Sequence, residues 1–116
     1  MDDRRYICRE LFRQLTAKAG TSSSPRILVH TLSLKWITLI AVDSEPALTL
    51  QIGIEDSHSD VPYSVHYSSD ARNVDGRAEV LFRDGGPLLF KENGEPVTLP
   101  AFANKLIHLV GGDVPA

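Results

Sequence analysis

A polar segment in the middle of the chain, residues 55–75, holds most of the side chains that are suited to chemistry. Two of the four histidines lie in it, His58 and His66. Asp56, His58 and Asp60 occupy alternate positions, and alternate residues of an extended strand point to the same side. Carboxylates and imidazoles in such an arrangement can ligate a divalent metal. The segment therefore supports one functional hypothesis, a small metal- or His/Asp-dependent hydrolase or nuclease that uses Asp56, His58, Asp60 and His66.

The established sequence motifs for this chemistry are missing. The chain has no His-Glu-x-x-His motif, no pair of cysteines and no Asp-x-Asp-x-Asp-Gly loop, which would indicate a zinc or calcium site. His66 and Ser68 have the His-x-Ser spacing of some phosphoesterases, but those enzymes need a second copy, and His30 and His58 do not supply it. The chain also lacks a Gly-x-Ser-x-Gly turn and a glycine-rich phosphate loop. We therefore expect no metal and no cofactor, and we favour a non-enzymatic function.

A row of arginines marks the N-terminal segment. Residues 3–19 are expected to form an amphipathic helix, and Arg5, Arg9 and Arg13, which we call the arginine row, lie opposite its apolar face. Positive charge in the first turns opposes the helix dipole, so helix stability does not explain the row. Guanidinium groups suit phosphates and carboxylate-rich protein surfaces. The row is interpreted either as a contact with a partner protein or second copy, or as a solvated helix face.

Charge is distributed unevenly along the chain, whose net charge is −3. Residues 1–26 carry six basic and three acidic side chains, and the remaining residues therefore have a net charge of −6. Such an asymmetry can orient a charged partner or a self-association. Nucleic-acid binding usually needs a larger basic excess and aromatic side chains between the basic ones. A nucleic-acid-associated accessory protein is therefore only the second alternative function.

The length and composition are those of one globular domain, residues 1–116. Hydrophobic residues make up 42% of the chain and charged residues 23%. Its single cysteine, Cys8, excludes an intramolecular disulfide and is expected to be buried in the first helix. The longest apolar run, residues 36–42, is far shorter than the roughly 20 residues needed to span a bilayer. We therefore expect a cytoplasmic protein that does not enter a membrane.

Strand signals dominate the rest of the chain. β-branched and aromatic residues favour three strands within residues 26–54, although one buried helix over residues 25–41 is a competing interpretation. The dipeptides Asp84-Gly85 and Asn93-Gly94 predict hairpin turns. A C-terminal helix begins at Pro100. The predicted strands are residues 26–32, 34–42, 47–54, a weak one at 61–67, and then 77–83, 87–92 and 95–99.

These elements predict an α+β fold. We expect one twisted antiparallel sheet of about six short strands, flanked in sequence by an N-terminal and a C-terminal helix that pack on one face of it. This arrangement buries both apolar helix faces with the fewest layers. The strand at residues 34–42 is apolar on both sides, so we expect helices to cover one side and a partner the other. Trp36 lies in this strand and is expected to belong to the core, with a binding platform as the alternative.

The function favoured by these observations is a non-enzymatic, cytosolic protein-interaction module that forms a homodimer. Its small size, acidic balance and order of elements resemble those of bacterial secretion chaperones and of phage or bacterial inhibitor proteins, an analogy at the level of fold. The resemblance implies an inhibitor-, immunity- or chaperone-like binding protein whose partner is another protein, itself, or both. The candidate partner-binding residues are Arg5, Arg9, Arg13, Asp56, His58, Asp60 and His66.

Overall fold

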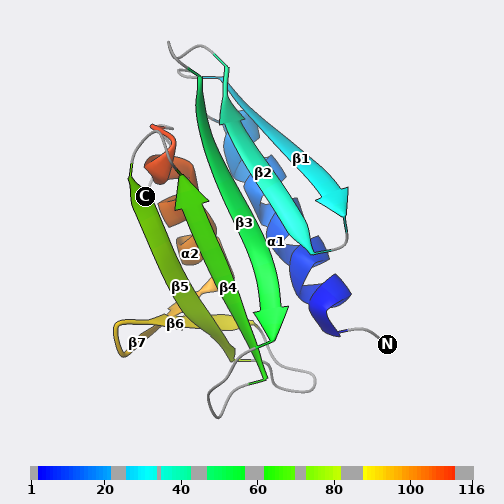
Figure 1. Cartoon of the computed structure of the whole chain (residues 1–116), viewed down its shortest axis with the longest axis vertical. Coiled ribbons are helices and arrows are strands. Elements are labelled where there is room, and N and C mark those ends of the chain that lie inside the picture. Colours follow the sequence, from blue (N-terminus) through cyan, green and yellow to red (C-terminus); the bar gives the residue numbers. More distant parts are fainter. Residues whose placement is uncertain are drawn as a thin grey trace.

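Two helices and seven strands make up the fold (Figure 1). The computed structural model describes residues 3–21, 26–33, 35–42, 47–56, 62–69, 73–81 and 88–111. The α+β class is confirmed, with seven strands in place of about six. The elements are α1 (Asp3–Thr21), β1 (Ile27–Ser33), β2 (Trp36–Ala41), β3 (Leu48–Asp56), β4 (Tyr63–Ser69), β5 (Val74–Leu81), β6 (Leu89–Glu92), β7 (Glu95–Thr98) and α2 (Leu99–Leu109).

The seven strands form one antiparallel sheet in which each strand pairs with its neighbours in sequence, in the order β1 to β7. This meander needs only short connections, as the hairpin signals indicate. Asn93 and Gly94 have φ angles of 58° and 89° in the β6–β7 turn, which confirms the turn predicted there. The predicted Asp84-Gly85 turn lies outside the described residues. The β6–β7 hairpin crosses the lower end of the sheet and leads into α2 (Figure 1).

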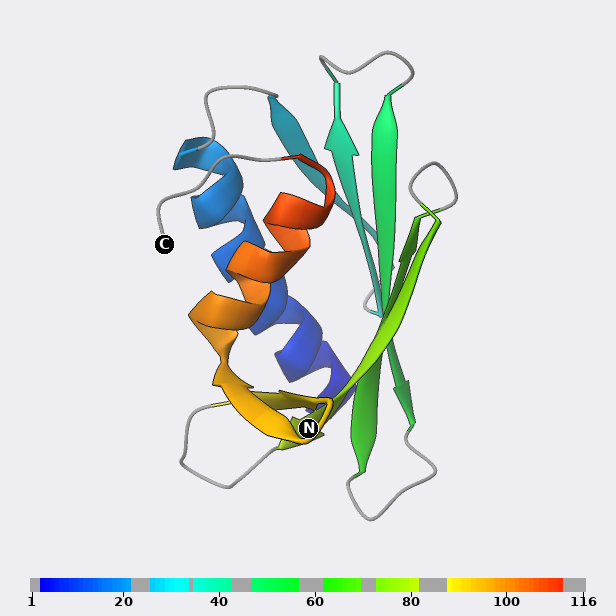
Figure 2. The same ribbon diagram turned by 90° about the vertical axis from the view of Figure 1, so that its left-hand side faces the viewer.

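Both helices lie on the same face of the sheet and pack against each other (Figure 2). Leu11, Leu15 and Leu106 are fully buried there, which confirms the single-sided architecture. Leu109 is only half-buried, whereas Ala103 and Ile107, expected at the border of the apolar face of α2, are fully buried. The difference arises because α2 contacts α1 as well as the sheet, so more of its circumference is covered.

The polar segment at residues 55–75 is more regular than its composition indicates. β3 continues to Asp56, β4 runs to Ser69, and β5 begins at Val74. One face of this sheet lies away from the helices, so polar side chains at alternate positions are compatible with strands whose backbone groups are paired. The competing helix over residues 25–41 is wrong, because β1 and β2 occupy that region as a hairpin.

The helix ends follow ordinary capping rules. Thr98 is the N-cap of α2 and its hydroxyl accepts a hydrogen bond from the amide of Ala101, while Pro100 stands in the first turn, as predicted. α1 ends at Thr21, two residues later than expected, and the Thr21 hydroxyl donates to the Lys18 carbonyl over 2.8 Å. Within the described ranges, neither helix has the length and apolar character needed to cross a membrane.

Candidate functional site

The sheet separates the predicted site residues into two groups. His66 lies on the face turned away from the helices, which we call the bare face. Its neighbours in β4, Val65 and Tyr67, are buried on the helix-covered face, and His66 pairs with Gly53 and Arg77. Asp56 is the last residue of β3, and the alternation of the strand places it on the helix-covered side. Its carboxylate is 3.7 Å from Arg4 of α1. His58 and Asp60 fall outside the described residues. The geometry therefore does not bring Asp56 and His66 together as one hydrolase site.

The arginine row lies on the helix layer, on the other side of the sheet from His66. All three side chains are exposed, as predicted. Arg9 and Arg13 each lie 3.7 Å from a Glu10 carboxylate oxygen, and the Arg9 guanidinium also lies 5.5 Å from the centre of the Tyr6 ring. These are loose surface contacts, which contribute little to folding. The row thus remains a separate, solvent-facing basic surface.

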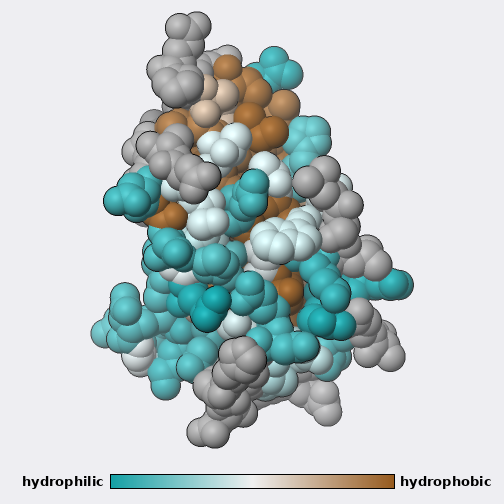
Figure 3. Space-filling view, in the orientation of Figure 1, coloured by the Kyte–Doolittle hydropathy of each residue, from teal (hydrophilic) through white to brown (hydrophobic). Residues whose placement is uncertain are grey.

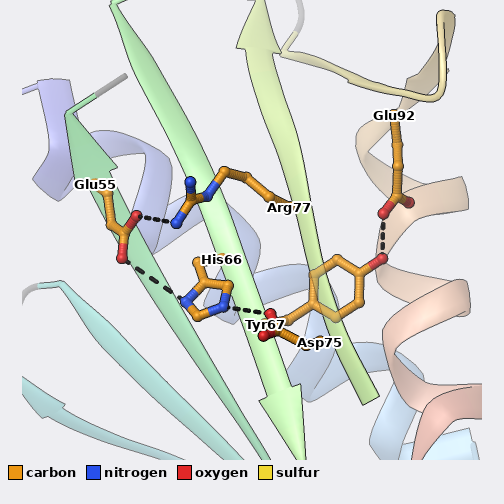
Figure 4. Close-up of polar contacts among 6 residues, drawn as sticks. All are labelled: Glu55, His66, Tyr67, Asp75, Arg77 and Glu92. Atoms are coloured by element: carbon orange, nitrogen blue, oxygen red, sulfur yellow. Dashed lines mark hydrogen bonds and ion pairs between the residues drawn. The ribbon is translucent and has the colours of Figure 1, made fainter. Parts of the chain in front are cut away.

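On the bare face, His66 belongs to a group of ionisable side chains that we call the ionic cluster, formed by Glu55, His66, Asp75 and Arg77 (Figure 4). His66 Nε2 lies 2.6 Å from Asp75 Oδ1, and its Nδ1 lies 3.8 Å from Glu55 Oε1. The Arg77 guanidinium is 3.2 Å from Glu55 Oε2. The imidazole is therefore held between two carboxylates from the strands on either side of β4.

The strand register explains how these residues meet. Gly53 of β3 pairs with His66 of β4, and His66 pairs with Arg77 of β5, so these positions form one row across the sheet. Glu55 and Asp75 lie two residues from this row on the same face, within reach of a side chain of ordinary length. The candidate residues chosen from the sequence include His66 but not Glu55, Asp75 or Arg77, although Glu55 and Asp75 lie in the same polar segment. Alternation indicates which residues share a face, but the row depends on a register that sequence alone does not define.

Trp36 extends the same row on β2, because it pairs with Gly53 from the other side. The expectation that it belongs to the core is wrong, since 43% of it is exposed on the bare face. Gly53 has no side chain, and a Cβ atom placed there would lie 2.9 Å from the indole Cζ3. The indole therefore lies across the glycine backbone, beside the ionic cluster. The physical reason is that side chains alternate between the two faces of a strand. Ile37, the next residue, is buried on the helix-covered face, so Trp36 must lie on the bare face.

An apolar patch covers another part of the bare face. It is formed by Leu28 of β1 and by Ile40 and Val42 in and just after β2, where Leu28 and Ile40 are directly paired. Val42 is 38% exposed, and the other two are half-buried. In the space-filling view apolar side chains gather at the upper end of this face, while hydrophilic ones cover its lower part (Figure 3). β2 thus carries apolar side chains on both of its faces, as the sequence predicts.

A second polar group, Tyr67, Glu92 and Lys105, lies on the helix side and connects β4, β6 and α2. The Tyr67 hydroxyl and the Lys105 ammonium both donate to the Glu92 carboxylate (Figure 4 shows the first contact). Burial and the hydrogen bond to Glu92 raise the pKa of Tyr67. Burial lowers the pKa of Lys105, but its contacts with Glu92 and Tyr67 outweigh this and leave it raised. This group links α2 to the sheet.

The remaining features of the described residues are a buried thiol and a surface pocket. Within the described ranges, no three His, Cys, Asp or Glu side chains are placed to hold a metal ion. Cys8 is 4% exposed, and burial raises the pKa of its thiol, which keeps it protonated and confirms its predicted burial. A shallow surface pocket of about 430 Å³ lies between α1 and the β7–α2 junction, lined by Tyr6, Glu10, Leu88, Thr98, Leu99 and Pro100. Its lining is mainly apolar and carries one carboxylate.

Comparison of the chain with protein-family models, with curated proteins and with solved structures finds no match.

Proposed function

We propose that this protein is a non-enzymatic protein-interaction module that binds another protein through the bare face of its sheet. The single observation that carries the proposal is the position of Trp36. A large aromatic side chain is exposed at the start of β2, on the face of the sheet that lies away from both helices. Trp is among the residue types that most often dominate the energy of protein interfaces. The proposal also includes the cytoplasm as its compartment, since a single buried cysteine suits a reducing environment.

The surroundings of Trp36 suit a protein partner better than a small molecule. Trp36 lies on an open sheet surface, with the apolar patch toward one end of the face and the ionic cluster beside it in the same cross-strand row. Interfaces commonly combine an apolar centre with a polar rim in this way. Polar contacts at the rim define orientation and discriminate between partners more than they add affinity.

The charges on the bare face indicate the chemistry of the partner. Glu55 and Asp75 bring two carboxylates to the ionic cluster, whereas Arg77 brings one permanent positive charge. The Asp75 side chain is 77% exposed and remains available to a second cation. A partner with an apolar socket for Trp36, bordered by lysine or arginine, would complement this surface.

The hydrolase alternative receives less support from the geometry. Its proposed residues Asp56 and His66 lie on adjacent strands, but on opposite faces of the sheet, so the sheet lies between their side chains. Asp56 instead faces Arg4, and His66 is occupied by Asp75 and Glu55. A cooperating acid and base would have to reach the same bound substrate.

The arginine row is a second candidate surface. Arg5 is exposed and, among the described residues, takes part in no ion pair or ring contact, while Arg9 and Arg13 share only Glu10. A carboxylate-rich partner protein would match this row. Since the row and the bare face lie on opposite sides of the molecule, variants of one surface serve as controls for the other.

The test uses a partner captured from the source cells on the immobilised chain and then purified. Its affinity is measured by calorimetry for the wild type, for Trp36→Ala and for the triple variant Arg5→Glu/Arg9→Glu/Arg13→Glu. We expect Trp36→Ala to weaken binding by at least about 30-fold, the loss typical of an interface hot spot. The triple variant should bind as the wild type does. Unchanged affinity of Trp36→Ala would exclude the bare face, and a loss in the triple variant alone would assign binding to the arginine row.

A further inference from the structure

The two edges of the sheet differ in how they are protected from pairing with another strand. β7 forms one edge; it has four residues and carries Glu95 and Pro96. Charge, proline and shortness are the usual devices that prevent an edge strand from pairing. β1 forms the other edge with seven residues, Ile27–Ser33, and contains neither proline nor a charged Asp, Glu, Lys or Arg. Its only irregularity is a register shift after Thr31. The β1 edge therefore lacks the protection of β7.

The hydrogen-bond pattern shows which groups this edge presents. The Val42 amide donates to the Arg26 carbonyl over 3.0 Å, so Arg26 and Val42 form a hydrogen-bonded pair. Such pairs alternate along an antiparallel ladder, so the backbone groups of Leu28 and His30 also face β2. The N–H and C=O groups of the residues between them, Ile27, Val29 and Thr31, consequently point away from β2. No described strand pairs with them.

Apolar side chains of β1 reach this edge from both faces of the sheet. Leu28 brings the apolar patch to the outermost strand of the bare face, while Val29 on the opposite face is only partly covered by the core. A strand added here would satisfy the outward backbone groups and cover the exposed parts of both side chains. Main-chain hydrogen bonds with apolar contacts on either face are the usual basis of binding by strand addition.

We propose that a second copy of this chain occupies the β1 edge, so that two β1 strands pair antiparallel and join two sheets into one. A two-fold axis at Val29 places Val29 opposite its own copy and Ile27 opposite Thr31 of the other chain, which engages all the outward groups. The inference rests on the proposed role as an interaction module and names one of its partners. It leaves the bare face open to another protein.

A second copy fits this edge because the strand is compatible with itself. Two-fold pairing brings identical side chains close together, and like charges opposite each other would destabilise it. β1 carries no such charge in its described strand, and the residue on the axis is a valine, which is favoured in strands. A foreign strand remains an outcome of the test below and not part of the proposal.

The first experiment measures mass in solution by sedimentation over a range of concentrations. We expect the wild type to reach twice the monomer mass. Thr31→Pro removes an N–H group that points away from β2, so β1–β2 pairing is preserved, and we expect the dimer dissociation constant to rise about tenfold or more. Thr31→Lys, at an exposed position, tests the same edge through charge. Thr49→Lys is the matched control on β3, where Thr49 is also exposed but away from the edge.

The second experiment tests the register by crosslinking. Hydrogen-bonded antiparallel pairs have Cα atoms about 5.5 Å apart, which is compatible with a disulfide. Oxidised Val29→Cys should therefore form a covalent dimer, whereas Thr49→Cys should not. The native thiol, Cys8, is buried and is not expected to compete. Circular dichroism of each variant shows whether it has folded.

The outcomes separate this inference from the proposed function. A wild type that stays monomeric, or a dimer that tolerates both Thr31 variants and gives no Val29→Cys crosslink, would overturn the edge dimer. A dimer lost in Thr49→Lys but retained in both Thr31 variants would assign self-association to the bare face and also overturn it. A monomer that binds a strand of another protein at β1 would also overturn the edge dimer. Binding of the separate partner, measured with Trp36→Ala, tests the bare face in each case.

Discussion

The ring of Tyr67 lies directly across Gly76, its paired residue on β5. A Cβ atom on Gly76 would lie 2.3 Å from the Tyr67 Cζ and 2.4 Å from its hydroxyl oxygen. The Tyr67 hydroxyl is bound to Glu92, and the residue is 3% exposed, so the ring has no free space into which to move. Trp36 lies across Gly53 in the same way on the opposite face of the sheet, but there 43% of the aromatic residue is exposed.

These two aromatic–glycine pairs predict different responses to the same substitution. We expect Gly76→Ala to lower the free energy of unfolding by about 1–3 kcal/mol, the usual cost of forcing extra atoms into a packed site. Gly53→Ala should change it by less than about 1 kcal/mol, because the exposed indole can shift and alanine reduces the entropy of the unfolded chain. Urea denaturation of both variants provides the measurement. If both variants lose the same free energy of unfolding, the burial of the ring does not determine how much the substitution destabilises the protein.

The interface between the two helices and the sheet should dominate stability. Leu11 and Leu106 have no exposed surface in the described structure, so Leu11→Ala or Leu106→Ala should cost roughly 2–5 kcal/mol through lost transfer energy and the cavity left behind. Thr16→Ala, at an exposed position of α1, serves as the control and should have little effect. Thermal and urea unfolding measure all three. Small losses at both leucines would contradict the shared helix–sheet core.

The arginine row should matter little for folding. Arg9 and Arg13 are 64% and 69% exposed in their side chains and both pair with Glu10, and exposed ion pairs contribute about 0–1 kcal/mol. The variant Arg5→Glu/Arg9→Glu/Arg13→Glu should therefore melt at nearly the wild-type temperature. Circular dichroism checks this before any binding measurement. If the variant unfolds, the row has a structural role, and its binding data carry no weight.

Stability should fall at alkaline pH. The pKa values of Cys8 and Tyr67 are raised above their usual 9.0 and 10.0, chiefly by burial, so the folded state holds these protons more tightly than the unfolded state. Stability is therefore fully present below about pH 9, and it is lost as pH rises through the folded pKa values, because the unfolded chain releases the protons first. The raised pKa of Lys105 acts in the same direction above 10.5.

The measurement is the urea midpoint between pH 7 and pH 11. The variant Cys8→Ala should lose some stability at every pH through lost packing, but its decline should begin at higher pH than that of the wild type. Tyr67→Phe should flatten the later part of the curve. A wild-type midpoint that stays constant to pH 11 would contradict the assigned effect of burial on these groups.

Local patterns in the sequence were sufficient to predict most of the elements. The alternation of residues 34–42 and the apolar spacing of Leu11 and Leu15 depend only on backbone geometry, which repeats every two residues in a strand and every 3.6 in a helix. The Asn93-Gly94 turn follows from the tolerance of these residues for positive φ. The same rules were less successful for residues 55–75. The weak strand predicted at 61–67 is present as β4 (Tyr63–Ser69), but polar side chains concealed the ends of β3 and β4 and the start of β5. Their pairing, and not their composition, makes them strands.

The sequence by itself thus determined the α+β class, the single-sided helix layer and the burial of Cys8, because each follows from periodicity and from the need to cover apolar side chains. Only the tertiary structure decided that Trp36 lies exposed beside His66 and that Asp56 lies on the other side of the sheet. It also decided that Glu55, Asp75 and Arg77 surround His66. These relationships depend on the register between neighbouring strands of the sheet, and a shift of one residue would move every side chain of a strand to the opposite face.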